Sequence, residues 1–345
     1  MIGWYIHHHG RGHAHRAGAV AVALRGRRVV TGLSSVPEPV GWPGPWVTLG
    51  RDDVGHGPDG EAVVDPSAGG VLHWAPLGDS GLRERMAAVV AWVHQYRPRL
   101  VVVDASVEVT LLLRLLGVPV VVVAAPGDRL DRPHRAAYDS AVHLLAPWPE
   151  WVAPVGWPAH WTAKTTAVGA FSRFDARPAV PVVPGTVTVL WGAGGVDVTS
   201  DQLAEAVRAT PAWRWTVLGG RVALPTELGV YQPGWVADPW PLLTSAQVVI
   251  THAGQNAVAE VAAARRPAVV LAQQRPHGEQ HSTAAVLASA GLAHSPLAWP
   301  AAGQWPAVLA ATAARDGTLW QRWSPGDGAG RAARTVLEAA SCVPA

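Results

Sequence analysis

Short runs of almost purely apolar residues alternate with helical patterns along nearly the whole chain. The run Leu100–Asp104 consists of Leu and Val up to its final acid, and residues 118–123 repeat this pattern after a helical stretch at 107–116. Strands that are apolar on both faces are typical of parallel sheets covered by helices on both sides. The sequence therefore predicts an α/β fold in which strands and helices take turns.

The region 148–184 interrupts this alternation because it is rich in Pro and Trp. Pro178, Pro181 and Pro184 have the spacing of a semi-rigid linker, and the alternation restarts at residue 186. A chain of 345 residues is long enough for about two domains. We expect two doubly wound, Rossmann-like domains, 1–175 and 176–325, with ligands at the carboxyl ends of their strands, in a cleft between the halves. A C-terminal helix at 326–345 can pack back towards the first domain.

Composition excludes several classes of protein. The 27 basic and 25 acidic residues nearly cancel, which argues against a nucleic-acid partner. The only cysteine, Cys342, allows no intrachain disulfide and no cysteine-based metal site, and this fits a reduced cytoplasm. No apolar stretch reaches the roughly 20 residues of a membrane-spanning helix. We expect a cytoplasmic protein without a transmembrane segment, and peripheral contact with a membrane is left open.

A glycine-containing turn follows the first predicted strand, Ile2–Ile6. The residues of this loop and the helix after it are Gly10, Arg11, Gly12, His13 and Arg16. Glycines let the backbone turn sharply and approach a ligand. His13 then stands at the carboxyl end of the strand, where a general base belongs. A solvent-exposed glycine turn is an equal alternative from the spacing alone.

Two other features suggest a metal site, but the pattern does not support one. His7, His8 and His9 are consecutive, and consecutive residues on an extended strand point to alternating faces. Asp52 and Asp53 are adjacent, and neighbouring acids rarely converge on one ion. We therefore expect no metal site, and we place the two acids on the surface of a loop.

Two further turns lie in the second half. A glycine-rich turn after the strand at 186–191 contains Gly192, Gly194 and Gly195; such a turn can hold phosphate oxygens with backbone amides, but it lacks the spacing of a dinucleotide fingerprint. The strand at 247–251 leads into His252, Gly254, Gln255 and Asn256, where a helix begins whose N-terminus can hold a diphosphate.

Acids and amides follow this second turn. Glu260 lies about one helical turn beyond Asn256, where a carboxylate can accept hydrogen bonds from ribose hydroxyls, although a surface acid is the usual role of such a residue. Glu279 and Gln280 end a polar loop and can bind the hydroxyls of a sugar.

These residues resemble a known pattern. The segment 247–293 is similar to the donor-binding half of GT-B glycosyltransferases, above all to the family that contains the peptidoglycan N-acetylglucosaminyltransferase MurG, and also to the macrolide and UDP-glucuronosyl transferases. There an apolar strand precedes a His/Ser-x-Gly turn, a helix with a ribose-binding Glu, and a loop ending in Asp/Glu-Gln. The chain has the matching residues in the same order: His252, Gly254, Glu260, Glu279 and Gln280. The glycine loops at 10–13 and 192–195 agree with this family in placement.

The resemblance implies a GT-B fold and a metal-independent glycosyltransferase that needs no cofactor. It would move a sugar from a nucleoside diphosphate, preferably UDP or dTDP, to a hydroxyl of a small-molecule or lipid-linked acceptor. The second domain would bind the donor, with Trp235 and Val236 near its base and the helix from Gln255 facing the departing diphosphate. The first domain would bind the acceptor, and His13 would take its proton. Asp104 is placed to orient His13, although capping a helix is the alternative for this acid.

Two other functions stay open. Gly12, His13 and Arg16 also resemble the pattern of GT-B enzymes that hydrolyse nucleotide sugars with water as the acceptor. A non-catalytic protein that binds nucleotide sugars is a third class.

Overall fold

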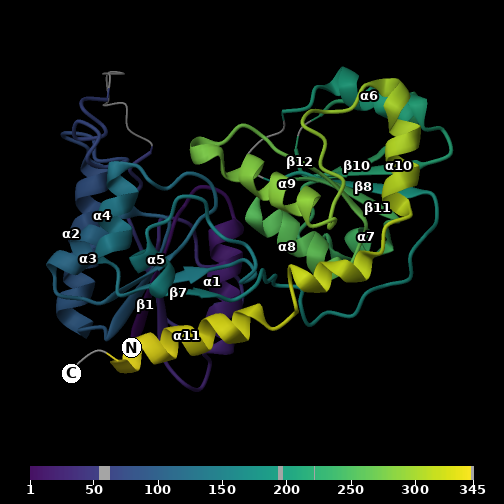
Figure 1. Cartoon of the computed structure of the whole chain (residues 1–345). Coiled ribbons are helices and arrows are strands. Elements are labelled where there is room, and N and C mark those ends of the chain that lie inside the picture. Colours follow the sequence, from purple (N-terminus) through teal and green to yellow (C-terminus); the bar gives the residue numbers. More distant parts are fainter. Residues whose placement is uncertain (54–62, 193–196, 221, 343–345) are drawn as a thin grey trace. The chain divides into compact units, whose positions relative to one another are not determined.

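The computed structural model describes residues 1–53, 63–192, 197–220 and 222–342, and the chain divides into two compact units. Unit 1 combines Met1–Val168 with the C-terminal segment that begins at Gly328, and unit 2 is Gly169–Asp327 (Figure 1). The sequence placed these boundaries after residues 175 and 325. None of the helices in the described residues has the length and apolarity that a membrane span requires.

Unit 1 is built on a seven-stranded parallel sheet within the described residues, in the order β3-β2-β1-β4-β5-β6-β7. Its strands are β1 (Ile2–Ile6), β2 (Val30–Ser34), β3 (Trp46–Thr48), β4 (Leu100–Asp104), β5 (Val120–Val123), β6 (His143–Ala146) and β7 (Thr165–Ala167). The order reverses between β1 and β4, where Ile6 lies opposite Asp104 in the register. In a doubly wound sheet this reversal is the point where ligands bind, beyond the carboxyl ends of the strands.

Helices cover both faces of this sheet. They are α1 (Gly12–Ala23), α2 (Ser80–Tyr96), α3 (Val107–Leu115), α4 (Arg132–Ser140), α5 (Ala159–Ala163) and α11 (Gly328–Cys342). The C-terminal helix α11 packs on α1 and also contacts β4 and β6, while α3 packs against α4 (Figure 1). Right-handed crossovers explain this division, because the chain winds in opposite directions on the two sides of β1.

Unit 2 repeats the same plan with a five-stranded parallel sheet in its described residues, in the order β10-β9-β8-β11-β12. Its strands are β8 (Thr186–Leu190), β9 (Arg214–Leu218), β10 (Tyr231–Gly234), β11 (Val248–His252) and β12 (Ala268–Leu271). Its helices are α6 (Ser200–Ala209), α7 (Trp240–Ser245), α8 (Gln255–Ala264), α9 (Glu279–Ser289) and α10 (Trp305–Ala313), with short 3-10 turns η1 (Thr226–Leu228), η2 (Pro276–Gly278), η3 (Ala302–Gln304) and η4 (Gly317–Arg322). This sheet reverses between β8 and β11, so the prediction of two doubly wound α/β halves is confirmed.

The Pro- and Trp-rich region 148–184 belongs only in part to the connection between the units. Its first part folds into unit 1, because α5 and the edge strand β7 both lie before the end of that unit at Val168. Trp161 on α5 is fully buried, and its indole N–H donates to Asp139 at 2.5 Å. The Trp residues that gave this region the composition of a linker therefore include core residues of unit 1.

The helices begin in two different ways. Side chains cap the first turns of α2, α3, α4 and α6, through Asp79, Ser106, Asp131 and Thr199. Helices α5, α7, α9 and α10 begin without a side-chain capping bond. The same holds at the two points where the sheets reverse, where Arg11 precedes α1 and Gly254 precedes α8. The first amides of an uncapped helix can turn to a ligand instead.

Candidate functional site

His13, Asp104 and Arg16 come together at the reversal point of unit 1. His13 Nδ1 lies 2.8 Å from Asp104 Oδ1, and Arg16 binds the same carboxylate twice, through Nε to Oδ2 at 3.0 Å and Nη2 to Oδ1 at 2.7 Å. Asp104 is buried, with its side chain 1% exposed, while the His13 side chain is 25% exposed. The site therefore has a buried carboxylate behind a histidine that solvent or substrate can reach.

The charges in this cluster fix the protonation of Asp104. Burial alone would raise the pKa of this carboxyl, but the Arg16 guanidinium and the hydrogen bonds from His13 and Arg16 hold it well below its usual range. An ionised carboxylate can only accept, and Asp104 Oδ1 lies nearer to Nδ1, at 2.8 Å, than Arg16 Nη2 does, at 3.3 Å, so the proton of neutral His13 belongs on Nδ1. Its Nε2 then carries a lone pair, as a general base requires.

The structure changes the expected surroundings of His13 in two ways. Helix α1 already begins at Gly12, so Gly12 and His13 belong to its first turn and Arg16 lies buried within it; only Gly10, with a φ of +73°, and Arg11 precede the helix. The capping alternative for Asp104 is wrong, because Ser106 caps α3. Arg16 follows His13 by three positions on α1, which puts both side chains on one face.

A cavity of about 320 Å³ lies beside this cluster in unit 1. Its walls come from β1, the loops after β1 and β3, and helices α2 and α3, and they include Tyr5, His8, Asp53, Trp74, Arg85 and Glu108. His7 also lines it, and the centre of the His7 ring is 5.7 Å from that of His13. The cavity is therefore adjacent to the proposed base.

Arg85 is the centre of a buried network under this cavity that the sequence analysis missed. The guanidinium is 3% exposed and binds the Asp52 carboxylate, the Tyr5 hydroxyl at 3.2 Å and the Ser35 hydroxyl at 2.9 Å. Burial raises the pKa of Tyr5 to about 12, so its hydroxyl stays protonated. The prediction that Asp52 lies on a loop surface is wrong, because its ion pair with Arg85 is buried.

The three consecutive histidines follow β1 rather than end it. His7 Nδ1 accepts a hydrogen bond from the backbone of His9 at 3.1 Å, and the His7 and His8 rings stack with their centres 4.8 Å apart. Burial, together with the neighbouring imidazoles, lowers the pKa of His7 to about 2 and keeps it neutral. His8 is also buried, whereas His9 is exposed.

In unit 2 the reversal point has a different character. His252 ends β11, and its Nδ1 accepts the backbone N–H of Gly254 at 3.0 Å. Gly192 and Gly254 both lie tightly against this ring: an added Cβ would come within 2.9 Å of His252 Nε2 at one position and 2.5 Å of Cε1 at the other. Burial and the charge of Arg275 lower the pKa of His252 to about 4, so the imidazole is neutral.

Glu260 is buried on α8 and faces a positive partner. Its Oε1 lies 3.3 Å from Nε of Arg173, and the residue is 9% exposed. Burial raises the pKa of this carboxyl, while the Arg173 charge opposes the shift. The role of a surface acid is therefore excluded. Gln255 and Asn256, in the first turn of the same helix, are partly exposed.

The remaining predicted donor residues are spread over three loops. Gln280 is buried on α9, where its side-chain oxygen accepts the backbone N–H of Gln273 at 3.0 Å, and Glu279 is half-buried at the start of that helix. Trp235 is 51% exposed just after β10, and Val236 is partly buried. Gly194 and Gly195 lie outside the described residues.

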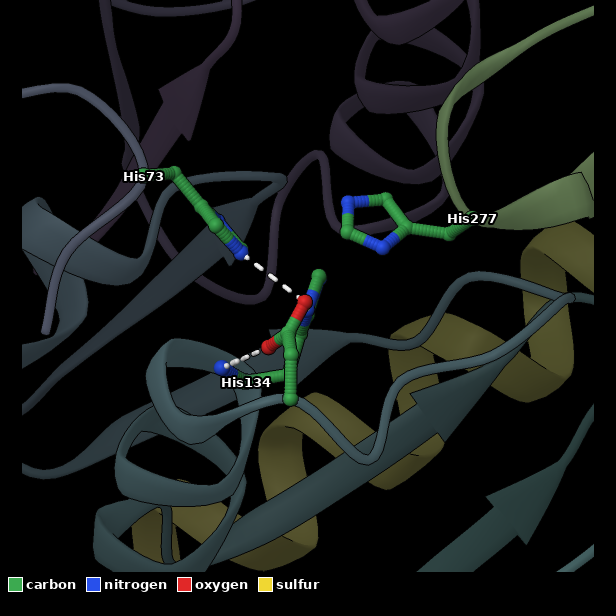
Figure 2. A group of neighbouring side chains, drawn as sticks. His73, His134 and His277 are labelled. Atoms are coloured by element: carbon green, nitrogen blue, oxygen red, sulfur yellow. Dashed lines mark hydrogen bonds and ion pairs between the residues drawn. The ribbon is translucent and has the colours of Figure 1, made fainter. Parts of the chain in front are cut away.

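Two groups in the described part of unit 1 bring imidazole and carboxylate atoms within 4.8 Å of one another. One consists of His8, His9 and Asp53. In the other, Asp131 binds His73 Nε2 at 3.2 Å and His134 Nδ1 at 2.8 Å. Figure 2 shows both histidines, with dashed lines for hydrogen bonds. His277, which is also labelled there, belongs to unit 2.

An arginine touches each of these groups. Arg51 donates to Asp53 through two nitrogens, at 2.9 and 2.7 Å, and Arg129 Nη1 lies 3.3 Å from His134 Nε2. A neighbouring guanidinium disfavours a bound cation by charge repulsion. Both groups have the donor atoms for a divalent ion but not the surrounding charge.

Comparison with known proteins agrees with this geometry. Residues 239–295, which span α7 to α9, match the model of the glycosyltransferase family 28 C-terminal domain. No curated protein matches the sequence.

Solved structures resemble the chain over almost its whole length. They include the glycotransferase of kitacinnamycin (TM-score 0.72, 16% identity, 98% of both chains covered), MurG of Acinetobacter baumannii (0.61, 14%, 99% of both chains) and the spinosyn rhamnosyltransferase SpnG complexed with thymidine diphosphate (0.60, 16%, 100% of this chain and 97% of that chain). The chain therefore has the GT-B fold, and the match of residues 239–295 to the family 28 C-terminal domain supports a glycosyltransferase.

Proposed function

We propose that the protein transfers a sugar from a nucleoside-diphosphate sugar, with UDP or dTDP as the preferred carrier, to a hydroxyl of a small-molecule or lipid-linked acceptor, without a metal ion. The observation that carries this proposal is the imidazole of His13 backed by buried Asp104 in a GT-B fold. The family 28 domain over 239–295 supports a nucleotide-sugar donor, and SpnG was solved with a thymidine diphosphate.

His13 acts as the general base in this proposal. The acceptor hydroxyl gives its proton to Nε2 while its oxygen forms the new bond to the anomeric carbon of the sugar. The bond from that carbon to the diphosphate breaks, and the diphosphate leaves with the electron pair. Asp104 stabilises the imidazolium that forms, and Arg16 holds the carboxylate ionised and in place.

Unit 2 supplies the donor site. The first turn of α8, at Gln255 and Asn256, has no side-chain cap, and its backbone amides donate hydrogen bonds to the diphosphate. The helix dipole stabilises the negative charge that develops as the diphosphate leaves. Glu260 accepts hydrogen bonds from the ribose. Gly192 and Gly254 let the two turns pack closely around His252. Glu279 and Gln280 bind the sugar, and the backbone at Trp235 and Val236 contacts the base.

Hydrolysis is the second candidate, because a base that activates an acceptor hydroxyl can also activate water. Product analysis separates the two: release of free sugar at an equal rate with and without acceptors identifies a hydrolase, and a glycoside identifies a transferase. Binding without any turnover identifies a non-catalytic protein.

The first experiment is a thermal-shift screen of UDP-, dTDP- and GDP-linked sugars, since a ligand at 100 times its Kd stabilises the folded state by about 2.7 kcal/mol. The best ligand is then incubated with acceptors and the products are analysed by mass spectrometry. Absence of any nucleotide-sugar binding contradicts the proposal.

A further inference from the structure

One buried donor beside the unit 1 cavity has no acceptor. The side chain of His8 is 2% exposed, and its Nε2 has no hydrogen-bond partner among the described residues. The nearest charged oxygens are Asp53 Oδ2 at 3.2 Å and Asp52 Oδ1 at 3.6 Å, but neither meets Nε2 in hydrogen-bond geometry. A buried polar atom without a partner is costly, so a site of this kind calls for a ligand that supplies one.

The tautomer of His8 follows from its other neighbour. Arg85 Nη2 lies 3.2 Å from His8 Nδ1, and a guanidinium has only donors, so Nδ1 presents its lone pair and Nε2 carries the proton. The atom that faces Asp52 and Asp53 is therefore an N–H group. The Arg85 guanidinium is itself held by hydrogen bonds to four other residues, Asp52, Tyr5, Ser35 and Gly50, and so keeps the His8 ring in place.

A hydroxyl group satisfies both His8 and the acids. A hydroxyl can accept from His8 Nε2–H and at the same time donate to a carboxylate oxygen of Asp53. An ammonium group cannot accept the His8 proton. A carboxylate or a fully ionised phosphate could accept it, but neither has a proton to donate to Asp53.

The walls of the cavity limit the rest of the ligand. A volume of about 320 Å³ is at the lower end of ligand pockets. Trp74, which is 37% exposed, lines the cavity with its ring held by a hydrogen bond from Nε1 to the Asp52 carbonyl at 2.7 Å. Glu108 fixes the same loop by accepting the backbone N–H groups of His73 and Trp74, at 2.8 and 3.1 Å.

We propose that the acceptor is a small, uncharged, polyhydroxylated ring, such as a monosaccharide or a cyclitol, and that the His8–Asp53 pair reads one of its hydroxyls. Trp74 provides an aromatic face for the ring, and another hydroxyl reaches His13 past His7, whose ring lies between the two ends of the site. This inference rests on the proposed function, which left both small-molecule and lipid-linked acceptors open. It makes His8 a residue that determines specificity.

The test measures acceptor binding without catalysis. Wild-type protein is titrated, by ligand-observed NMR, with methyl α-D-glucopyranoside, other methyl glycosides and myo-inositol. The comparison compounds are 4-nitrophenol, a flat phenol, and 1-octanol, an apolar alcohol, and each has a single hydroxyl. At least one polyol should bind, and the two comparison compounds should bind at least about tenfold more weakly, in line with the loss of one or two net hydrogen bonds. Polyols that do not bind, or comparison compounds that bind best, overturn the inference.

Variants locate the recognition at His8. His8→Leu removes the donor and should weaken polyol binding by about tenfold, whereas His8→Gln places an N–H near Nε2 and should restore most of it. His94→Leu, at an exposed position on α2, is the matched control. Equal polyol affinity in wild type and His8→Leu, with both folded by circular dichroism, contradicts the role of His8.

Transfer assays with the same compounds keep this inference separate from the proposed function. A polyol that binds at His8 but is never glycosylated contradicts transfer and leaves the recognition site standing. Glycosylation of 4-nitrophenol or 1-octanol in preference to every polyol confirms transfer and overturns the inference.

Discussion

The two units share one topology but place different chemistry at the reversal points of their sheets. In unit 1, between β1 and β4, ionisable side chains converge: a buried carboxylate, an arginine and an accessible imidazole. In unit 2, between β8 and β11, glycines pack against a neutral histidine, and a helix begins there without a side-chain cap. The first arrangement suits proton transfer and the second suits an anionic ligand held by backbone amides. The same fold thus carries a side-chain site and a backbone site.

The largest effect should come from His13. Removing a general base costs about 10²–10⁴-fold in rate, so His13→Ala should lower kcat by that factor. Nucleotide-sugar affinity should stay unchanged, because the donor residues belong to unit 2. Steady-state kinetics and calorimetric titration with the donor measure the two quantities, and His94→Ala is the control. A variant that keeps wild-type kcat would remove the proton-transfer role from unit 1.

Asp104→Asn sharpens the same point. An amide can present its N–H to His13 Nδ1, which favours the tautomer with the proton on Nε2, so the base loses its lone pair. We expect a fall in kcat of at least about 10², with little change in donor Kd. Circular dichroism distinguishes this role from simple loss of folding, because the spectrum should match the wild type while the activity is low at every pH.

Glu260 tests the donor site of unit 2. Loss of a buried, hydrogen-bonded acid typically costs about 1–3 kcal/mol, so Glu260→Ala should weaken the binding of the nucleoside diphosphate by about 5- to 150-fold. Arg173→Ala is the companion variant, because it removes the ion-pair partner and leaves the carboxylate. If only Arg173→Ala weakens nucleotide binding, the contact belongs to the arginine and the assignment of Glu260 fails.

Acids in the two units should also affect stability with opposite signs. Asp104 has a lowered pKa, so its contribution to stability is present above the unfolded pKa of about 3.9 and is lost as the pH falls. Burial raises the pKa of Asp175 in unit 2 to about 6, and this acid favours the folded state below about pH 4 and loses that contribution as the pH rises through 6.

Asp175→Asn should therefore stabilise the protein at pH 7, on the order of 1 kcal/mol after allowance for partial exposure, and should leave it unchanged at pH 4. Thermal unfolding at several pH values gives the comparison, with an exposed acid, Glu38→Gln, as the control. A Tm difference that does not vary between pH 4 and pH 7 would contradict the raised pKa.

The sequence predicted the parts of this molecule that depend on local pattern. Leu100–Asp104 and Ala268–Leu271 appear with the expected bounds, because continuous apolar runs identify buried parallel strands. His13 and Asp104 could be chosen from their positions after strands. Arg16 was grouped with the residues of the first loop and was not paired with Asp104, although its spacing of three from His13 puts the two on one helical face.

The rest depends on contacts between distant segments. Asp52 and Arg85 are more than 30 positions apart and pair only because the loop after β3 meets α2. Glu260 and Arg173 are also far apart in the sequence and pair only in the folded unit 2. No periodicity within either segment reports such a pair, so a buried acid was taken for a surface one at Asp52. The edge strand β7 was missed for a different reason, since nearby Pro and Trp residues gave its surroundings the composition of a linker.

The smallest expected effect concerns metal ions. In the proposed mechanism the first turn of α8 stabilises the departing diphosphate, so EDTA should leave the rate of transfer unchanged within error. Unit 1 has two groups with the donor atoms for an ion, so this prediction can fail. We expect no bound ion, because Asp53 and His134 each lie beside an arginine that disfavours a cation. Assays before and after EDTA, and after addition of Mn²⁺ or Zn²⁺, should give equal kcat. If EDTA abolishes activity and Mn²⁺ restores it, the backbone site of unit 2 does not stabilise the leaving group on its own. The variants His9→Ala and His73→Ala would then identify which of the two groups holds the ion.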